Sequence, residues 1–231
     1  MSKLDILSEL PNWLVADAEE TIKKYNFDAS HDMTHFVNTF LFAKQIIDEE
    51  FENAELIENL SLIAARRVTL YSAFIHDRVD GKYMNVEEEV HLFREKAIKN
   101  NLSIPEVDAI IYIITNMSFS KRMERMRNNL PMIEKSPYEL ALKIVIDADQ
   151  LEAYRIERTE LYQTAIHGYK QEPERSKLIN GWIKTILVKR VLLYKDHFMN
   201  TNTGKREAAK RHDGVQNYVD EKYKNVEMFG Y

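Results

Sequence analysis

Three observations predict an all-α protein. The 231 residues include only 6 glycines and 5 prolines, and such a shortage of helix breakers favours long helices over short strands joined by turns. Apolar residues recur at helical spacing, for example at Phe36, Phe40, Ala43 and Ile47. No segment alternates apolar and polar residues convincingly enough to indicate a β-strand.

In the first half of the chain, breakers and polar turns mark the ends of the expected helices. Pro11 precedes the first helix, and a polar turn at 26–30 precedes the second. The third helix ends in the apolar run at 68–75, and a loop with Gly81 follows it. The expected helices here are residues 12–24, 31–50, 53–75 and 86–100.

The second half shows the same pattern. Ser103 and Glu106 frame a helix start, with Pro105 in the first turn. Gly204 is expected to break the chain before the last helix. The expected helices are residues 104–117, 137–167 and 176–197, and a last one that ends near 224. Residues 1–231 are interpreted as a single domain, with a helical core at about 12–170 and C-terminal helices at about 174–226 packed on it.

Composition excludes several classes of protein. The chain has no cysteine, so a reducing, cytoplasmic setting is expected and any metal ligands must be His or carboxylates. No apolar run approaches the roughly 18 residues that span a membrane. The net charge of −5, with both signs mixed along the chain, disfavours a duplex nucleic-acid binder. Two basic clusters, at 121–127 and 205–211, are interpreted as solvated helix faces.

Four segments concentrate His and Asp, namely 31–35, 76–77, 80–82 and 147–149. The pair at 76–77 follows the apolar run Leu-Tyr-Ser-Ala-Phe-Ile, which predicts that it lies deep in the core. Buried His and Asp are costly unless they are paired or bind a cation, and Arg78 is the only nearby cation in the sequence. Two His and two Asp suit a divalent ion such as Mn, Fe, Co, Zn or Mg.

These segments, taken in order, resemble the HD-domain phosphohydrolases, and most closely the small bacterial HD hydrolases. His35, His76-Asp77 and Asp149 match the H…HD…D signature of that superfamily. The segments that resemble the bacterial enzymes also include Ser30-His31-Asp32, Asp80-Gly81-Lys82-Tyr83, Met117-Ser118-Phe119-Ser120, the run at 147–153 (DADQLEA) and the run at 192–197 (LLYKDH). The resemblance therefore covers nearly the whole chain, and an ordered set is far more specific than one HD dipeptide.

The resemblance implies a helical HD-domain bundle with one divalent metal ion. The implied ligands are His35, His76, Asp77 and Asp149, with Mn²⁺ the first choice of metal and Mg, Fe, Co or Zn as alternatives. The residues implied to act on the substrate are Asp80, which would position water, Lys82, which would bind a substrate phosphate, and His31, which would donate a hydrogen bond near the metal. Asp147 is implied to orient a ligand or to cap a turn.

The chain departs from the resembled pattern after its last ligand, where small residues are replaced by Tyr and Arg. Arg155 and Arg158 could clamp a phosphate, because guanidinium matches phosphate bidentately. They could equally form ion pairs with Glu152, Glu157 or Glu160, one turn away. The sequence favours the ion pairs.

The function expected from these features is metal-dependent hydrolysis of a small phosphorylated substrate. Within the resembled group this would be cleavage of a nucleoside triphosphate to monophosphate and pyrophosphate. The alternatives are a nucleoside monophosphate phosphatase and a non-catalytic module that binds metal or nucleotide. A cyclic-nucleotide phosphodiesterase ranks lower, because a second ligand set is not evident. No membrane or duplex nucleic-acid partner is expected, and a homodimer is compatible with the sequence.

Overall fold

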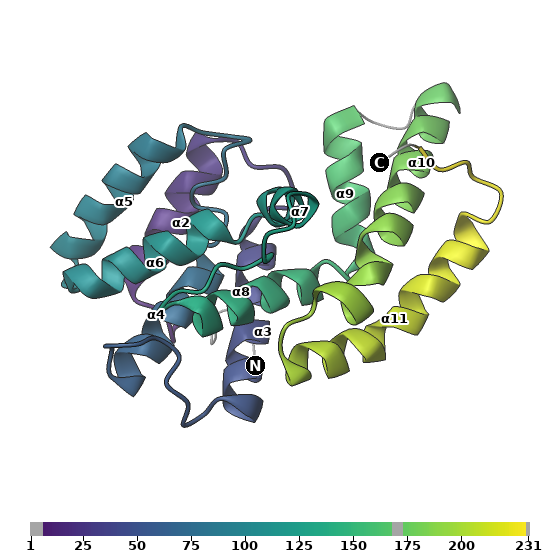
Figure 1. Cartoon of the computed structure of the whole chain (residues 1–231). Coiled ribbons are helices and arrows are strands. Elements are labelled where there is room, and N and C mark those ends of the chain that lie inside the picture. Colours follow the sequence, from purple (N-terminus) through teal and green to yellow (C-terminus); the bar gives the residue numbers. More distant parts are fainter. Residues whose placement is uncertain (1–6, 168–172, 230–231) are drawn as a thin grey trace.

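A computed structural model of the chain describes residues 7–167 and 173–229. Within these residues all regular structure is helical, which confirms the predicted fold class (Figure 1). No helix among them is long and apolar enough to cross a membrane. The elements are α2 (Asn12–Lys24), α3 (Met33–Glu50), α4 (Leu62–Phe74), α5 (Val86–Lys99), α6 (Ile104–Asn116), α7 (Phe119–Arg127), α8 (Glu139–Glu152), α9 (Ile156–His167), α10 (Pro173–Lys189), the 3₁₀ turn η1 (Val191–Leu193), the π-helical turn η2 (Tyr194–Phe198) and α11 (Asn202–Lys222).

The helices form two groups in contact with each other. In the first group α3 packs against α4 and α8, and α4 also packs against α6. In the second group α9 packs against α10, and α11 reaches back onto α3 and α8 (Figure 1). Phe36, Phe40, Ala43 and Ile47 are at most 1% exposed, so the apolar stripe predicted for α3 is its buried face.

Helix ends differ from the prediction where tertiary contacts outweigh local pattern. The expected helix at 53–75 begins only at Leu62, where the Ser61 hydroxyl accepts a hydrogen bond from the Ala64 N–H. The expected helix at 137–167 is divided into α8 and α9. The break contains Tyr154, which is 5% exposed and whose hydroxyl accepts from the Lys195 N–H. This contact with η2, 41 residues further along the chain, cannot be predicted from the local sequence.

Two further differences lie beyond these helices. The expected helix at 176–197 ends at Lys189 and continues as the turns η1 and η2. Helix α7 was not predicted, although it begins within the segment at 117–120 that the sequence singled out.

The sequence predicted that Gly204 breaks the chain before the last helix. This prediction is wrong, because Gly204 lies inside the first turn of α11. The reason is the close approach of Asp147, which is fully buried. The Asp147 carboxylate holds Thr201, the N-cap residue of α11: its Oδ2 accepts from the Thr201 N–H at 2.7 Å and from the Thr201 hydroxyl at 2.8 Å. A Cβ at position 204 would lie 2.6 Å from Asp147 Oδ2, so only glycine fits there without movement.

We therefore expect Gly204→Ala to lower the free energy of unfolding by about 2 kcal/mol, the usual cost of overpacking a buried contact. Urea denaturation at neutral pH measures this. Gly214→Ala is the matched control in the same helix, because its Cβ would meet no atom within 4 Å. Alanine is the better helix former, so the control should be neutral or slightly stabilised. An equal loss in both variants would contradict the proposed clash.

Arg78 was the expected cationic partner of the pair at 76–77, but its guanidinium binds other carboxylates. It is 5% exposed, and its Nε donates to Asp17 Oδ2 on α2 at 2.9 Å, while Nη1 donates to Glu89 on α5. Lys24 Nζ also donates to Glu89, at 2.7 Å. Arg78 thus ties the turn that carries His76 and Asp77 to two helices of the first group.

This network predicts a pH dependence of stability. Burial raises the pKa of Glu89, but its bonds to Lys24, Tyr25 and Arg78 outweigh burial and lower the pKa to about 2, against an ordinary 4.5. A lowered carboxyl pKa stabilises the fold above the unfolded-state value, and that contribution is lost as the pH falls from about 4.5 to about 2. We expect Glu89→Gln to be about 3 kcal/mol less stable at pH 7. Denaturant titrations at several pH values should show that the difference in unfolding free energy between wild type and Glu89→Gln narrows from pH 4.5 to pH 2. A difference that stays constant over this range would contradict the link between stability and the pKa of Glu89.

Candidate metal centre

The start of α3 positions His35. Asp32 is the N-cap residue, and its Oδ1 accepts from the N–H groups of Thr34 at 2.8 Å and His35 at 3.2 Å. His35 is fully buried, and its Nδ1 lies 3.0 Å from Glu152 Oε2 on α8. A carboxylate only accepts, so Nδ1 carries the hydrogen and Nε2 keeps its lone pair. The cap and Glu152 together fix where that lone pair points.

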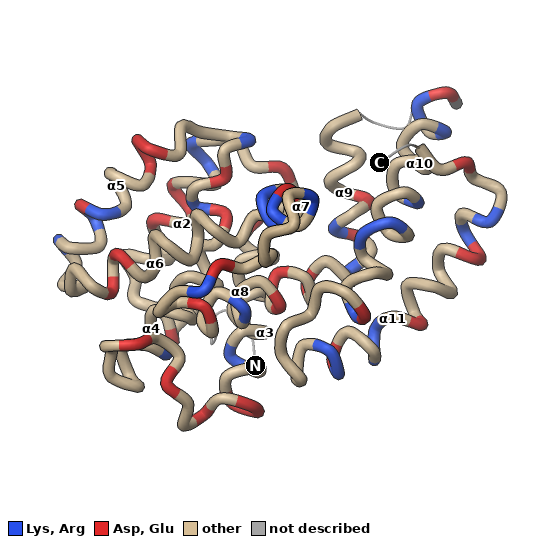
Figure 2. Tube along the Cα trace, in the orientation of Figure 1, with Lys and Arg blue, Asp and Glu red and all other residues tan. Residues whose placement is uncertain are grey.

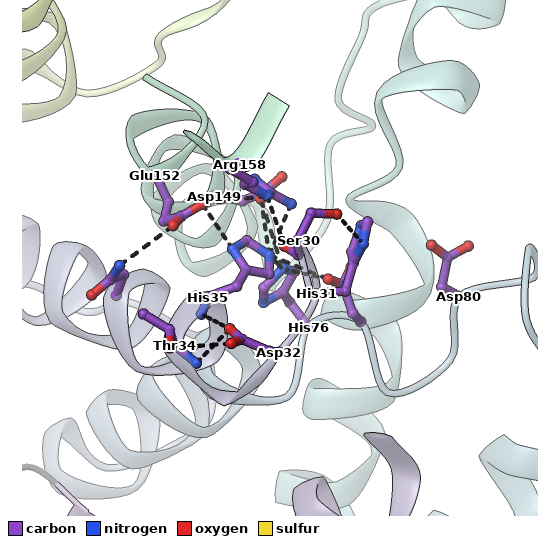
Figure 3. Close-up of polar contacts among 12 residues, drawn as sticks. Ser30, His31, Asp32, Thr34, His35, His76, Asp80, Asp149, Glu152 and Arg158 are labelled. Atoms are coloured by element: carbon purple, nitrogen blue, oxygen red, sulfur yellow. Dashed lines mark hydrogen bonds and ion pairs between the residues drawn. The ribbon is translucent and has the colours of Figure 1, made fainter. Parts of the chain in front are cut away.

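His76 and Asp77 lie in the turn that follows the buried C-terminal end of α4. His76 is 3% exposed, and its Nδ1 donates to the Ala73 carbonyl at 2.9 Å. Its Nε2 is therefore turned toward His35, and the two Nε2 atoms lie 2.7 Å apart (Figure 3). Two residues that are far apart in the sequence thus direct the same ring atom at one point.

Two carboxylates complete the group around this point. Asp77 Oδ2 lies 3.2 Å from Nε2 of both histidines. Asp149 Oδ1, from the last turns of α8, lies 3.6 Å from Nε2 of His35 and 3.7 Å from Nε2 of His76. The structure therefore brings together all four residues that the resemblance implied as ligands.

The donor set fits a divalent ion. Asp77 Oδ2 is buried and has no hydrogen-bond partner among the described residues, although burial of such an atom is costly. Two ring nitrogens at 2.7 Å need a cation or a proton between them. Two imidazoles and two carboxylates are ligands that Mn²⁺, Zn²⁺, Co²⁺ and Fe²⁺ accept. His35, His76 and Asp149 also satisfy the geometric spacing of a metal site.

The pKa values in the group reflect its mutual charges. Burial lowers the pKa of His76, but the charge of Asp77 and Asp149 raises it, to about 9. Burial raises the pKa of Asp77, but the two histidines hold it well below its usual range. Burial likewise raises the pKa of Asp149, which the charges of Arg158 and the histidines lower. The charges of the group therefore favour a cation among its members.

Glu152 is a site residue that the sequence interpretation treated only as an ion-pair partner. It is 1% exposed and holds His35, as a carboxylate commonly orients a metal-ligating histidine. A sequence signal was available, since Glu152 lies three residues after Asp149 and so on the same face of one helix.

A cavity of about 460 Å³ opens beside the four ligands. His31, Asp80 and Lys82, the residues implied to act on the substrate, all line it. His31 is 6% exposed, and its Nδ1 lies 2.8 Å from the Ser30 hydroxyl. Asp80 Oδ1 accepts from the Lys82 N–H at 2.9 Å, and Figure 3 shows Asp80 to one side of the ligand group. Lys82 Nζ lies 5.5 Å from the ring centre of Tyr162.

The two arginines after Asp149 take different positions. Arg155 is absent from the cavity lining, and its Nε donates to Glu152 Oε1 at 2.6 Å. Arg158 lines the cavity and bridges into the ligand group, where Nη1 donates to Asp149 Oδ1 at 3.0 Å. Its side chain is only 15% exposed, so its ion pairs are not the surface pairs that the sequence favoured. A role of either residue in substrate binding stays a prediction.

The basic cluster at 121–127 is not uniformly solvated, contrary to the sequence interpretation. Arg122 is 4% exposed and Lys121 lines the cavity, while Arg125 and Arg127 remain on the surface. Figure 2 shows the concentration of Lys and Arg on α7, between the two groups of helices. Arg190, at the end of α10, also lines the cavity and was not predicted.

No protein-family model matches the sequence, and no curated protein matches it. Solved structures do match the fold. A crystal structure of a Lactobacillus plantarum protein matches with a TM-score of 0.65 and 22% identity, over 92% of this chain and 95% of that one. Bacillus subtilis YpgQ matches with a TM-score of 0.60 and 21% identity, over 92% and 97%. An HD-superfamily hydrolase from Bacillus thuringiensis matches with a TM-score of 0.60 and 20% identity, over 96% and 97%.

At this level of identity the likeness establishes the fold. The chain has the same all-helical fold as the solved HD-superfamily hydrolase, so the predicted fold class is confirmed. Within that bundle, His35, His76 and Asp149 form a group with the spacing of a divalent metal site.

Proposed function

We propose that this protein is a metal-dependent phosphohydrolase that cleaves a nucleoside triphosphate into monophosphate and pyrophosphate. One observation carries the proposal: four ligand atoms from His35, His76, Asp77 and Asp149 surround one point beside a cavity whose lining also includes four Lys and Arg side chains. Cationic side chains beside a metal centre suit an anionic substrate such as a phosphate ester or anhydride.

The four ligands would hold one divalent ion, with Mn²⁺ the preferred candidate. When bound, such an ion supplies a Lewis acid that polarises a phosphate oxygen and lowers the pKa of water. The contribution of the protein is to aim the ligands. Glu152 and the Ala73 carbonyl fix the two imidazole tautomers, and the cap at Asp32 fixes the first turn of α3.

Three residues outside the ligand set would act on the substrate. Asp80 would orient water and accept its proton, because its carboxylate lines the cavity and Oδ2 remains open to a partner besides Lys82 Nζ, which lies 3.6 Å away. Lys82 would offer a charge to a substrate phosphate. His31 would contact the substrate through the ring edge that remains, since its Nδ1 is held by Ser30 and Asp28.

The spread of cations supports a polyphosphate over a single phosphate. Lys82, Lys121, Arg158 and Arg190 line the cavity from four separate segments: a loop, α7, α9 and the end of α10. A monophosphate presents one charged group near the metal, whereas a triphosphate extends its charge over several such contacts. The monophosphatase alternative needs only the ligand group and one of these cations.

The purified protein should be assayed against nucleoside tri- and monophosphates with Mn²⁺, Mg²⁺, Co²⁺ or Zn²⁺. Pyrophosphate and orthophosphate should be measured in parallel, and metal content determined by elemental analysis. Release of pyrophosphate from a triphosphate would support the proposal. Orthophosphate from monophosphates alone would favour the phosphatase. Bound metal without turnover of any nucleotide would indicate the non-catalytic module.

A further inference from the structure

Arg158 contacts two of the atoms that would also bind the metal. Its Nη2 lies 2.9 Å from Nε2 of His35, and its Nη1 lies 3.0 Å from Oδ1 of Asp149. Its Nε donates to the Ser30 carbonyl at 3.2 Å and lies 3.3 Å from Glu152 Oε2 (Figure 3). The guanidinium thus contacts two candidate ligands and Glu152, which orients one of them.

Nε2 of His35 cannot accept a hydrogen bond from Arg158 and coordinate a metal ion at the same time. Guanidinium only donates, so a hydrogen bond to Nε2 draws on the single lone pair of that nitrogen, which Nε2 of His76 also faces at 2.7 Å. A metal ion coordinated by His35 needs the same lone pair. The contact with Asp149 is not exclusive in this way, because a carboxylate oxygen has a second lone pair. A metal would therefore release Nη2 while Nη1 can stay in place.

We propose that Arg158 is an internal cation that occupies the ligand group in the metal-free protein, and that metal binding releases its Nη2 to bind an anion beside the metal. The identification of that anion as a substrate phosphate rests on the proposed function. Arg158 lines the cavity, and its side chain is 15% exposed, so the side chain already borders the space that a substrate would enter.

Charge balance supports both states. The ligand group and Glu152 place three carboxylates close together, and two of them contact Arg158 directly. In the metal-free state the guanidinium therefore offsets repulsion that would otherwise open the site. In the metal-bound state the ion takes over this role, and a guanidinium held next to it provides a geometry suited to a phosphate group.

The first test is titration of metal-free protein with Mn²⁺ by calorimetry, without substrate, for wild type, Arg158→Met and Arg155→Met. Arg155→Met is a matched control, because Arg155 also pairs with Glu152 but contacts no ligand atom. Loss of a charge should strengthen Mn²⁺ binding slightly in both variants. Loss of the competitor should strengthen it by roughly 10- to 100-fold in Arg158→Met, which corresponds to one charged hydrogen bond. Metal-free Arg158→Met should also melt at a lower temperature, and Mn²⁺ should restore it.

The second test is binding of inorganic pyrophosphate to the Mn²⁺-loaded proteins at equal free Mn²⁺. Arg158→Met should bind it roughly tenfold more weakly than wild type, and Arg155→Met should not differ. If Arg158→Met does not fold, Arg158→Lys replaces it, because lysine keeps the charge but cannot bridge both ligands. Arg158→Lys should still bind Mn²⁺ more tightly than wild type.

Weaker or unchanged Mn²⁺ binding in Arg158→Met, relative to Arg155→Met, would overturn the proposal and make Arg158 a support for the ligands. Unchanged pyrophosphate binding in Arg158→Met would overturn the claim that Arg158 binds an anion beside the metal. Failure of the proposed function is distinguishable from these outcomes. A wild type that binds Mn²⁺ but hydrolyses no nucleotide leaves both titrations interpretable, whereas a wild type that binds no Mn²⁺ would overturn both proposals.

Discussion

His76→Ala should yield a folded protein that holds no divalent ion and has no measurable phosphohydrolase activity. His76 supplies one of the four ligand atoms and lies between Asp77 and Asp149. Its removal takes away one ligand and leaves the partly buried carboxylates of Asp77 and Asp149 close together, so the remaining site cannot hold the ion and the acids repel each other. Wild type should carry about one divalent ion per chain, as measured by elemental analysis after purification with Mn²⁺ and without chelator.

A stability measurement separates loss of metal from loss of fold. A bound ion stabilises the folded state by about 2.7 kcal/mol when its free concentration is 100 times its Kd. Wild type should therefore melt at a higher temperature with Mn²⁺, and His76→Ala should not respond. His91→Ala is the matched control, because His91 has a 70% exposed side chain and lies away from the site on α5. Retained metal in His76→Ala, or loss of metal in His91→Ala, would contradict the assignment.

Asp80→Asn should lower kcat by about 10²- to 10⁴-fold, the usual contribution of a general base, with metal content and KM little changed. The substitution is well matched to the structure. Asn keeps an Oδ1 that can accept from the Lys82 N–H, so the loop should retain its shape while the charge is lost. Steady-state kinetics at saturating Mn²⁺, with elemental analysis of the same sample, measures both quantities.

Lys82→Ala should behave differently and raise KM as well, because a phosphate contact made in the ground state contributes to binding. Near-normal kcat in Asp80→Asn would assign the proton transfer to another group. Asp32 is a poor substitute, since its carboxylate caps α3 through two N–H groups. Loss of metal in Asp80→Asn would instead make Asp80 a ligand, and a site with two metal ions would then have to be considered.

Features that depend on short segments were predicted well from the sequence. The buried stripe of α3 follows from the spacing of Phe36, Phe40 and Ala43, because helical periodicity reports directly which face meets the core. The four candidate ligands could be selected because each lies in a short distinctive segment whose order along the chain matches a known pattern. His76 and Asp77 stood out further, because polar residues directly after an apolar helix end are costly to bury without a partner.

The tertiary structure alone decided the partners of the charged residues. Arg78 was expected beside Asp77 because it is its neighbour in sequence, yet it pairs with Asp17, 61 residues away. Arg158 was expected on the surface, yet it reaches His35, 123 residues away. Periodicity shows which residues are buried, but the partner of a buried charge depends on distances across the packed core. Those distances are set only when the helices assemble.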